Sequence, residues 1–175
     1  MVAIKNVLLF VAAASALTIP LGKRTAATII SDVSTINTNV QALTSAANAY
    51  TGGISNALKV QQAEQTLDKS IIQAGKDANA TAALSSADST KISDAIQSLI
   101  PNIDASIKAI EAKKAQFATD GLTQVVLDDF KSLQSNTDKL ADRLIIIASS
   151  DVKTRAQQQK ATIDSYFAAG IKFFS

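Results

Sequence analysis

The sequence predicts an all-α fold: a single-domain, five-helix up-and-down bundle whose long central helix is kinked near Pro101. Three observations support this fold class. Apolar residues recur at alternating spacings of three and four over long stretches after residue 25, which is the pattern of one buried helix face. Short segments with glycine, asparagine or serine separate these stretches. The chain contains no cysteine, so packing alone has to stabilise the core.

The first 24 residues have the features of a leader. Residues 1–16 have a positively charged start, a short apolar stretch and small residues at the end, as signal peptides do. Residues 17–24 form a spacer that ends at the dibasic pair Lys23-Arg24. We expect processing after this pair, which leaves residues 25–175 as the bundle domain. The alternative is a dibasic pair that occurs by chance on a solvated face.

Removal of the leader changes the charge. Residues 1–24 hold three of the 17 basic residues and none of the 15 acids, so residues 25–175 carry 14 bases, 15 acids and a net charge of −1. Binding to nucleic acid needs a basic surface that displaces counterions. The sequence therefore predicts no nucleic-acid partner.

Composition also excludes much catalytic chemistry. The chain has no histidine and no cysteine, which excludes a Ser-His-Asp triad and a zinc site with those ligands. No Gly-rich phosphate loop is present. The acids fall mostly on predicted polar helix faces, where solvated carboxylates are expected. We expect a protein that is not an enzyme and has no cofactor and no metal site.

The first predicted helix spans Ala26 to Tyr50 and ends at Gly52-Gly53, because glycine accepts the left-handed conformation that follows many helices. One apolar seam runs along it: Ile29, Val33, Ile36, Val40, Leu43, Ala47 and Tyr50.

The second predicted helix spans Ile54 to Ala78 and has a weaker apolar face made of Leu58, Val60, Leu67, Ile71 and Ala74. Asn79-Ala80-Thr81 follows in a predicted loop. This is an N-glycosylation sequence, so Asn79 is a candidate acceptor.

The third and longest predicted helix starts near Ser85 and ends at Asp120-Gly121. Ser85 and Asp88 form a loose capping box at its start. Pro101 removes one backbone donor and crowds the preceding turn, so a kink is expected there. The apolar stripe continues in phase beyond it: Ile92, Ile96, Leu99, Ile100, Ile103, Ile107, Ile110 and Phe117.

Two further helices complete the predicted bundle. The fourth spans Leu122 to Ala148, and Ser149-Ser150-Asp151 then offers oxygens that could cap the fifth, which spans Val152 to Phe173. Their apolar positions are Val126, Phe130, Leu133, Leu140, Leu144 and Ile147 in the fourth helix and Ala156, Ile163, Tyr166, Phe167, Gly170, Ile171 and Phe174 in the fifth. Short connections favour antiparallel neighbours.

Small and aliphatic residues on facing helices can leave an elongated cavity in place of a filled seam. We predict that such a cavity holds an amphiphile and is lined by Val33, Ile36, Val40, Leu67, Ile71, Ile96, Leu99, Ile103, Leu133, Leu140, Ile163 and Phe167. Ser70, Thr137 and Gln159 are candidate polar contacts that orient the ligand. The alternative is that the stripes form an ordinary core, that Ser70 and Thr137 bond to their own helices, and that Gln159 lies at a rim.

The central stretches Leu99 to Ile103 and Lys113 to Phe117, followed by the apolar pattern of the fourth helix, resemble the hydrophobic surface binding protein A family, which includes fungal cell wall galactomannoproteins. The resemblance covers the chain from Thr25. It implies a secreted, non-enzymatic binding protein, since family members adsorb to hydrophobic surfaces and some enclose fatty acids in a helical bundle. Wall-anchored members carry a Ser/Thr-rich stalk and an anchor signal, and we expect neither here.

Two functions follow as hypotheses. In the first, the protein is a secreted carrier that holds a fatty acid or another long-chain lipid inside the bundle. In the second, it adsorbs to hydrophobic surfaces through its apolar faces and recruits secreted hydrolases. Either one predicts an extracellular protein, free or loosely associated with the cell wall. We expect no transmembrane segment and no GPI anchor, because the apolar end from Ile171 to Phe174 is too short. Monomer and homodimer both remain open.

Overall fold

The computed structural model describes residues 24–175 and shows a single up-and-down helical bundle. The predicted all-α architecture is confirmed, but these residues form six helices and not five. The helices are α1 (Ala26–Ala49), α2 (Ile54–Asn79), α3 (Ser86–Glu111), α4 (Lys114–Thr119), α5 (Thr123–Ile147) and α6 (Lys153–Phe174). Residues 1–23 of the predicted leader, including Lys23 of the dibasic pair, lie outside the described residues.

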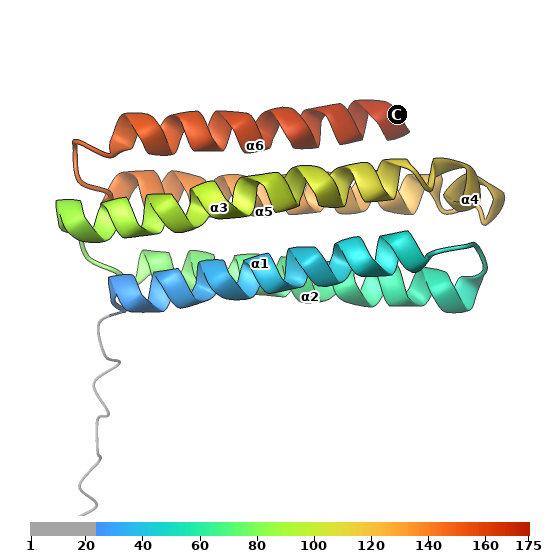
Figure 1. Ribbon diagram of the computed structural model, residues 1–175, viewed down its shortest axis with the longest axis horizontal. Coiled ribbons are helices and arrows are strands. Elements are labelled where there is room, and N and C mark those ends of the chain that lie inside the picture. Colours follow the sequence, from blue (N-terminus) through green and yellow to red (C-terminus); the bar gives the residue numbers. More distant parts are fainter. Residues whose placement is uncertain (1–23) are drawn as a thin grey trace, which may run out of the picture.

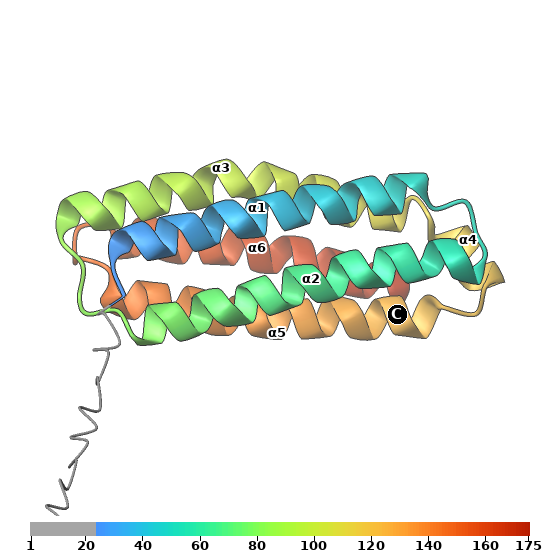
Figure 2. The ribbon, with the colours of Figure 1, turned by 90° about the horizontal axis from the view of Figure 1, so that it is seen from below.

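The five long helices form a closed ring around an apolar interior. α1 packs against α2 and α3, α5 packs against α2 and α6, and α3 and α6 close the ring. Figures 1 and 2 show the long helices side by side, with the short α4 across one end of the bundle. Each long helix therefore turns one face inward, which explains the single apolar stripe of each predicted helix.

The predicted third helix is divided into α3 and α4. Two turn residues, Ala112 and Lys113, separate them, and the Lys113 amide bonds to the Ile110 carbonyl at 3.0 Å. The break lets α4 turn across the bundle and place Phe117 over its end, where the ring of Phe117 stacks on Tyr50 at a centroid distance of 4.4 Å. Neither glycine nor proline marks this break, so local sequence signals could not predict it.

Most of the predicted helix boundaries are confirmed. The Ser85 hydroxyl caps α3 by accepting a hydrogen bond from the Asp88 amide at 3.1 Å, as the capping box predicts. The serines before the last helix do not cap it: α6 follows Val152, which makes no side-chain cap bond. α3 continues through Pro101 without interruption, and a kink at this residue stays a prediction.

Aromatic side chains close the α4 end of the bundle. Phe174 contacts Phe117 and Phe130 with ring centroids 6.5 and 5.7 Å apart. The Tyr50 hydroxyl donates a hydrogen bond to the Asp120 carboxylate, which also accepts the Gly53 amide at 2.5 Å. These contacts fix the α1–α2 connection to the segment that follows α4.

Lys113 and Lys114 also hold this end together. The Lys113 ammonium donates to the Asn48 carbonyl at the end of α1 at 2.9 Å, and the Lys114 ammonium donates to the Phe173 carbonyl at the end of α6. Lysines satisfy helix carbonyls in this way because the last turn of a helix has unpaired acceptors and negative partial charge.

None of the helices between Arg24 and Ser175 is long and apolar enough to span a bilayer. The predicted apolar face of α2 needs one correction. Leu58 is largely exposed, whereas Val60, Leu67, Ile71 and Ala74 are buried. Leu58 precedes Val60 by two residues and therefore points to another side of the helix.

Candidate functional site

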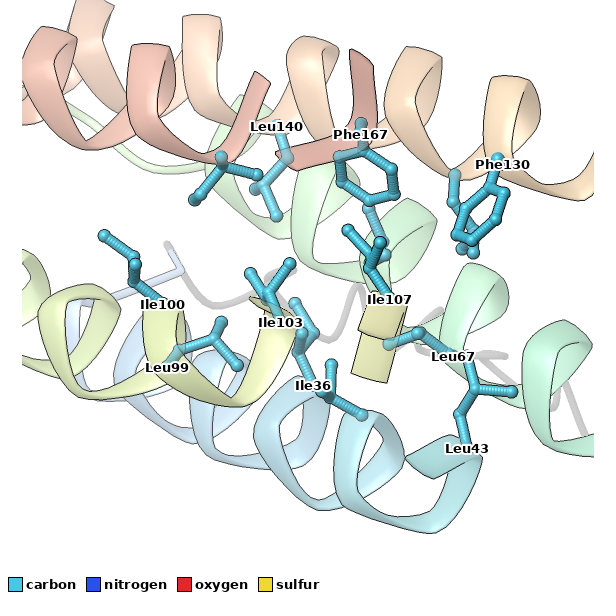
Figure 3. Packing of buried hydrophobic residues seen from close by; sticks show 14 of the residues in the cluster. Ile36, Leu43, Leu67, Leu99, Ile100, Ile103, Ile107, Phe130, Leu140 and Phe167 are labelled. Carbon is cyan, nitrogen blue, oxygen red and sulfur yellow. The ribbon is translucent and has the colours of Figure 1, made fainter. Parts of the chain in front are cut away.

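An apolar cavity of about 100 Å³ lies inside the ring of long helices. Side chains of all five long helices line it. Figure 3 shows several of them pointing toward one another: Ile36 and Leu43 from α1, Leu67 from α2, Leu99, Ile103 and Ile107 from α3, Phe130 and Leu140 from α5, and Phe167 from α6. Its volume is below the roughly 300–1,000 Å³ typical of small-molecule sites, so a long ligand would have to part the helices.

The structure brings the predicted apolar lining residues together. All twelve lie on the wall of this cavity: Val33, Ile36, Val40, Leu67, Ile71, Ile96, Leu99, Ile103, Leu133, Leu140, Ile163 and Phe167. They come from all five long helices, over residues 33–167 of the chain. Their role in binding a ligand stays a prediction, but their meeting at one cavity is an observation.

The three predicted polar residues take three different positions. Thr137 lies on the cavity wall, half-buried. Gln159 is buried there, not at a rim, and its amide nitrogen donates to the Ser93 carbonyl at 2.8 Å while its oxygen accepts from the Ser93 hydroxyl at 3.0 Å. Ser70 is not on the wall: its hydroxyl donates to the Leu67 carbonyl at 2.6 Å. Ser70 therefore bonds to its own helix, as the alternative hypothesis predicted, and does not contact the cavity.

Ser106 is a polar group of the cavity that the sequence analysis missed. It follows Ile103 by three residues and precedes Ile110 by four, so it continues the apolar stripe of α3. Its hydroxyl is buried on the cavity wall, and no partner within residues 24–175 bonds to it. Because a buried polar atom without a partner is costly, this hydroxyl is available to a polar group of a ligand.

Lys160 is the one charged side chain on the cavity wall among the described residues. Its ammonium donates to Asp138 of α5 at 2.8 Å and to Asp164 of α6 at 3.0 Å. Burial lowers the pKa of Lys160, but the bonds to these two carboxylates outweigh it and raise the pKa above its usual range. Lys160 therefore stays charged and ties α5 to α6 beside the cavity.

Two acids are buried, in contrast to the expectation that the acids are solvated. Asp77 pairs with Arg24, and Glu64 lines a small hollow of about 20 Å³ next to the cavity. The sequence does indicate the burial of Glu64, because it follows Val60 by four residues and precedes Leu67 by three and so lies on the apolar stripe of the helix. Burial, with the nearby Asp129 and Asp68, raises the pKa of Glu64 to about 7.

The remaining site predictions concern glycosylation and metals. Asn79 is exposed, but it is the last residue of α2 and does not lie in the predicted loop. The Thr81 hydroxyl of the same sequence motif is buried and donates to the Asp77 carbonyl at 2.7 Å. Glycosylation of Asn79 stays a prediction. Residues 24–175 bring no group of three metal-ligating side chains together.

Fold and cavity define the class: a helical-bundle protein whose long helices enclose an apolar interior. The model of the family described as hydrophobic surface binding protein A matches residues 26–145. The chain belongs to this family, and the resemblance drawn from the sequence is confirmed.

Known proteins of similar sequence are fungal. Cell wall mannoprotein 1 of Aspergillus flavus is 28% identical over 159 residues, which are 91% of this chain and 58% of that protein. Cell wall mannoprotein 1 of Aspergillus fumigatus is 27% identical over 139 residues, 79% of this chain and 48% of that protein. The chain thus spans about half the length of these curated relatives.

Solved structures share the fold. The crystal structure of AFMP4P in complex with palmitic acid is 44% identical and has a TM-score of 0.85, covering 86% of this chain and all (100%) of that chain. Ligand binding domain 2 of the MP1 protein of Penicillium marneffei, complexed with multiple arachidonic acids, has a TM-score of 0.82 at 18% identity, covering 88% of this chain and 98% of that chain. The second likeness concerns the fold alone.

Proposed function

We propose that this protein is a non-enzymatic carrier that holds a fatty acid or a similar single-chain amphiphile inside its bundle. The observation that carries the proposal is the cavity in the ring of helices, whose wall is almost entirely aliphatic and aromatic. The palmitic acid bound by AFMP4P supports the same ligand class, because that protein shares 44% of its residues and its fold with this chain.

The energetics favour an acyl chain as the ligand. Burial of each methylene contributes about 0.8 kcal/mol, so a chain of about 16 carbons yields roughly 12 kcal/mol before association and ordering costs are subtracted. Micromolar affinity requires about 8 kcal/mol. Apolar burial therefore reaches micromolar affinity when association and ordering cost about 4 kcal/mol, the low end of their range. The few polar groups of the cavity, such as Thr137, Ser106 and Gln159, add little to this free energy.

The cavity of about 100 Å³ is too small for a whole acyl chain, so binding requires the helices to move apart. No disulfide links the helices, so this expansion breaks side-chain packing and hydrogen bonds but no covalent bond. We expect the unliganded bundle to be narrower than the loaded one. The cost of this expansion lowers the net affinity for every ligand.

Native mass spectrometry of the secreted protein tests the carrier function. We expect a mass increment of one or more acyl chains that disappears after delipidation and returns when palmitate is added. A displacement assay with a fluorescent acyl probe gives the affinity. If the delipidated, folded protein binds no fatty acid at micromolar concentration, the carrier function is wrong.

A second function, adsorption to hydrophobic surfaces, is favoured by one feature of the surface. Ile54, Leu58 and Val125 are exposed at the α4 end of the bundle and line one shallow hollow. Exposed apolar patches of this kind mark interaction sites. Retention on hydrophobic beads in preference to hydrophilic ones tests adsorption, and a Leu58→Lys variant should be retained less. Recruitment of secreted hydrolases would then be tested on the coated beads.

We propose that the protein acts outside the cell, free or loosely associated with the wall. The cell wall mannoproteins among its relatives support this location. We also propose a monomer, because the five long helices already close one ring. Asn79 is exposed and is the proposed glycan acceptor. Sedimentation and glycosidase treatment of the secreted protein measure both.

A further inference from the structure

Three hollows follow one another from the central cavity to the surface along the contact between α2 and α5. The cavity shares four wall residues with the small hollow beside Glu64: Leu43, Ile110, Phe130 and Leu133. That inner hollow shares four others with an outer hollow of about 140 Å³: Val60, Phe117, Val126 and Asp129. The shared wall residues place the three hollows in a row, and the outer one opens to solvent at the α4 end of the bundle.

The outer hollow has an apolar rim. Ile54, Leu58 and Val125 are 62%, 55% and 42% exposed, and all three line it. Most other large apolar residues of the ring face inward, so these three form an exposed extension of the apolar interior. We call the outer and inner hollows together the α2/α5 mouth.

Polar side chains meet at the junction of the two hollows of this mouth. Glu64 is only 7% exposed, and its carboxyl oxygen Oε2 lies 3.2 Å from the Gln61 amide nitrogen. The same nitrogen lies 3.4 Å from the Asp129 carboxylate of α5. A single amide thus serves two acids, and the second Glu64 oxygen has no protein donor among the contacts of the described residues.

The other groups that face Glu64 are acidic or uncharged. Asp68, one turn further along α2, accepts from the Asn136 amide at 2.7 Å. The residues that α1, α3 and α4 contribute to the inner hollow are Leu43, Ile110 and Phe117, which carry no charge. Burial and the two acids Asp129 and Asp68 raise the pKa of Glu64 to about 7, so its carboxyl group holds a proton at mildly acidic pH.

A surface hollow also adjoins the cavity between α5 and α6, where it shares Ile145 and Lys160 with the cavity wall. Its rim is charged, with Asp142 and Asp164 beside Lys160. The bonds from Lys160 to Asp138 and Asp164 tie the two helices together there. α2 and α5 are also joined, by the bond from Asn136 to Asp68 at 2.7 Å, but this bond lies beyond the mouth. At the mouth itself the two helices share the long bond from Gln61 to Asp129.

We propose that the α2/α5 mouth is the head-group site for the amphiphile in the cavity, and that a fatty acid binds there with one proton shared between its carboxyl group and Glu64. This proposal rests on the carrier function. The acyl chain extends from the mouth along the hollows into the cavity. Val125 to Ile145 on α5 span about 30 Å, which is longer than an extended chain of 16 carbons.

The shared proton makes binding depend on pH. When Glu64 is protonated it donates a hydrogen bond to a fatty-acid carboxylate, and when it is ionised it repels that carboxylate. The apparent affinity is scaled by the fraction of protein in the competent form. With the pKa of Glu64 at about 7, the Glu64-dependent part of the affinity falls about tenfold between about pH 6 and about pH 8.

Tryptophan reporters locate the head group. The chain contains no tryptophan, so Val125→Trp at the α2/α5 mouth and Ile146→Trp at the α5/α6 hollow each introduce one fluorophore. Palmitate brominated at carbon 2 should quench Val125→Trp, and palmitate brominated at the methyl end should not. Ile146→Trp is the matched control and should show no quenching by the carbon 2 bromine.

Glu64→Gln tests the shared proton, because an amide can donate to a carboxylate at every pH. We expect this variant to bind palmitate at about pH 8 about tenfold more tightly than the parent protein does. Asp142→Asn, in the α5/α6 hollow, should keep the parental pH dependence. Hexadecanol, which has no ionisable head group, should bind the parent with less than about a twofold change over the same range.

The outcomes separate this proposal from the carrier function. If palmitate binds but its carbon 2 bromine quenches Ile146→Trp or neither reporter, the head group lies elsewhere and the proposal is wrong, while the carrier function stands. The shared proton is wrong if Glu64→Gln binds palmitate more weakly than the parent at both pH values. It is also wrong if the affinity of this variant falls between about pH 6 and about pH 8 as much as that of the parent does. If neither the parent nor the variants bind an acyl chain, the carrier function itself fails.

Discussion

The guanidinium of Arg24 lies 2.7 Å from the carboxylate of Asp77, a side chain that is almost entirely buried at the end of α2. Arg24 also makes an isolated β-bridge with Thr81, just beyond that helix. Asp32 of α1 lies nearby, and burial raises its pKa, with Asp77 adding to the rise and Arg24 opposing it. Arg24 thus supplies the positive charge at a pair of acids, although the sequence assigns it to a processed leader.

Loss of this guanidinium should destabilise the bundle. Arg24→Ala leaves the buried Asp77 without its charged partner, which we expect to cost about 1–3 kcal/mol of unfolding free energy. The matched control is Arg155→Ala, since Arg155 pairs at 2.7 Å with the exposed Asp94 and should cost less than about 1 kcal/mol. Urea denaturation of both variants measures the difference, and equal effects would contradict the role of Arg24.

A chain that begins at Thr25, the start expected from the dibasic pair, also lacks Arg24. We expect it to unfold at a lower urea concentration than a chain that begins at Arg24. N-terminal sequencing of the secreted protein shows which of these chains exists. A secreted protein that starts at Leu17 would contradict processing at Lys23-Arg24.

The buried Glu64 should make stability fall with rising pH. Its pKa is raised from 4.5 to about 7 in the folded protein, so the folded state favours the protonated acid. This contribution is fully present below the unfolded pKa and is lost as the pH rises from about 4.5 to about 7.

Glu64→Gln should remove most of that dependence and raise the unfolding free energy by about 2 kcal/mol at about pH 8. Thermal or urea unfolding at several pH values measures it. Asp142→Asn, at an exposed position, is the control and should leave the profile unchanged. A Glu64→Gln profile that still falls over the same range would show that another group is responsible.

Filling the cavity should weaken ligand binding without unfolding the protein. Ile103→Trp places a large ring on the cavity wall, where it displaces several methylenes of an acyl chain at about 0.8 kcal/mol each. We expect palmitate affinity to fall by more than about tenfold. Ile146→Trp, which introduces the same residue at an exposed position of α5, should bind as the parent does. Circular dichroism checks that both variants are folded.

Two glycines inside helices should respond differently to alanine. A Cβ at Gly75 of α2 meets no atom within 4 Å, whereas a Cβ at Gly170 of α6 would lie 3.1 Å from Cγ2 of Ile107 and 3.4 Å from Cζ of Phe130. Gly75→Ala should therefore gain about 0.8–1 kcal/mol of stability from helix propensity.

Gly170→Ala should lose most of that gain, because Ile107 or Phe130 has to shift to make room. Thermal unfolding of the two variants under the same conditions gives the comparison. Equal gains at both positions would show that α6 moves away from α3 and α5 at no cost, and that the packing around Gly170 is looser than the structure indicates.

The parts of the fold that sequence could predict are those set within one helix. Apolar spacing located every long helix, and the Ser85 cap and the Gly52-Gly53 turn set boundaries that the structure confirms. The same spacing placed the inward residues, such as Ile103 and Phe167, on the wall of one cavity. In a closed ring of helices every inward face meets the same interior, so the lining follows from the helix faces alone.

The parts that sequence could not predict depend on neighbours across the bundle. The break between α3 and α4 occurs where Phe117 packs on Tyr50, a contact between residues 67 positions apart. Ser70 and Ser106 look alike in sequence, yet Ser70 bonds to its own helix on a flank and Ser106 faces the cavity without a partner. Small shifts of helix rotation decide between such positions.

The sequence by itself determined that this is an all-α bundle with one aliphatic interior and no residues for histidine or cysteine chemistry. Only the tertiary structure decided where that interior meets solvent and which charges stand beside it: Glu64 and Gln61 at the α2/α5 mouth, Lys160 between Asp138 and Asp164, and Arg24 on Asp77. The physical reason is that periodicity states which side of a helix is buried. It does not state which helix lies opposite or at what height, and these two quantities set the distances between charges.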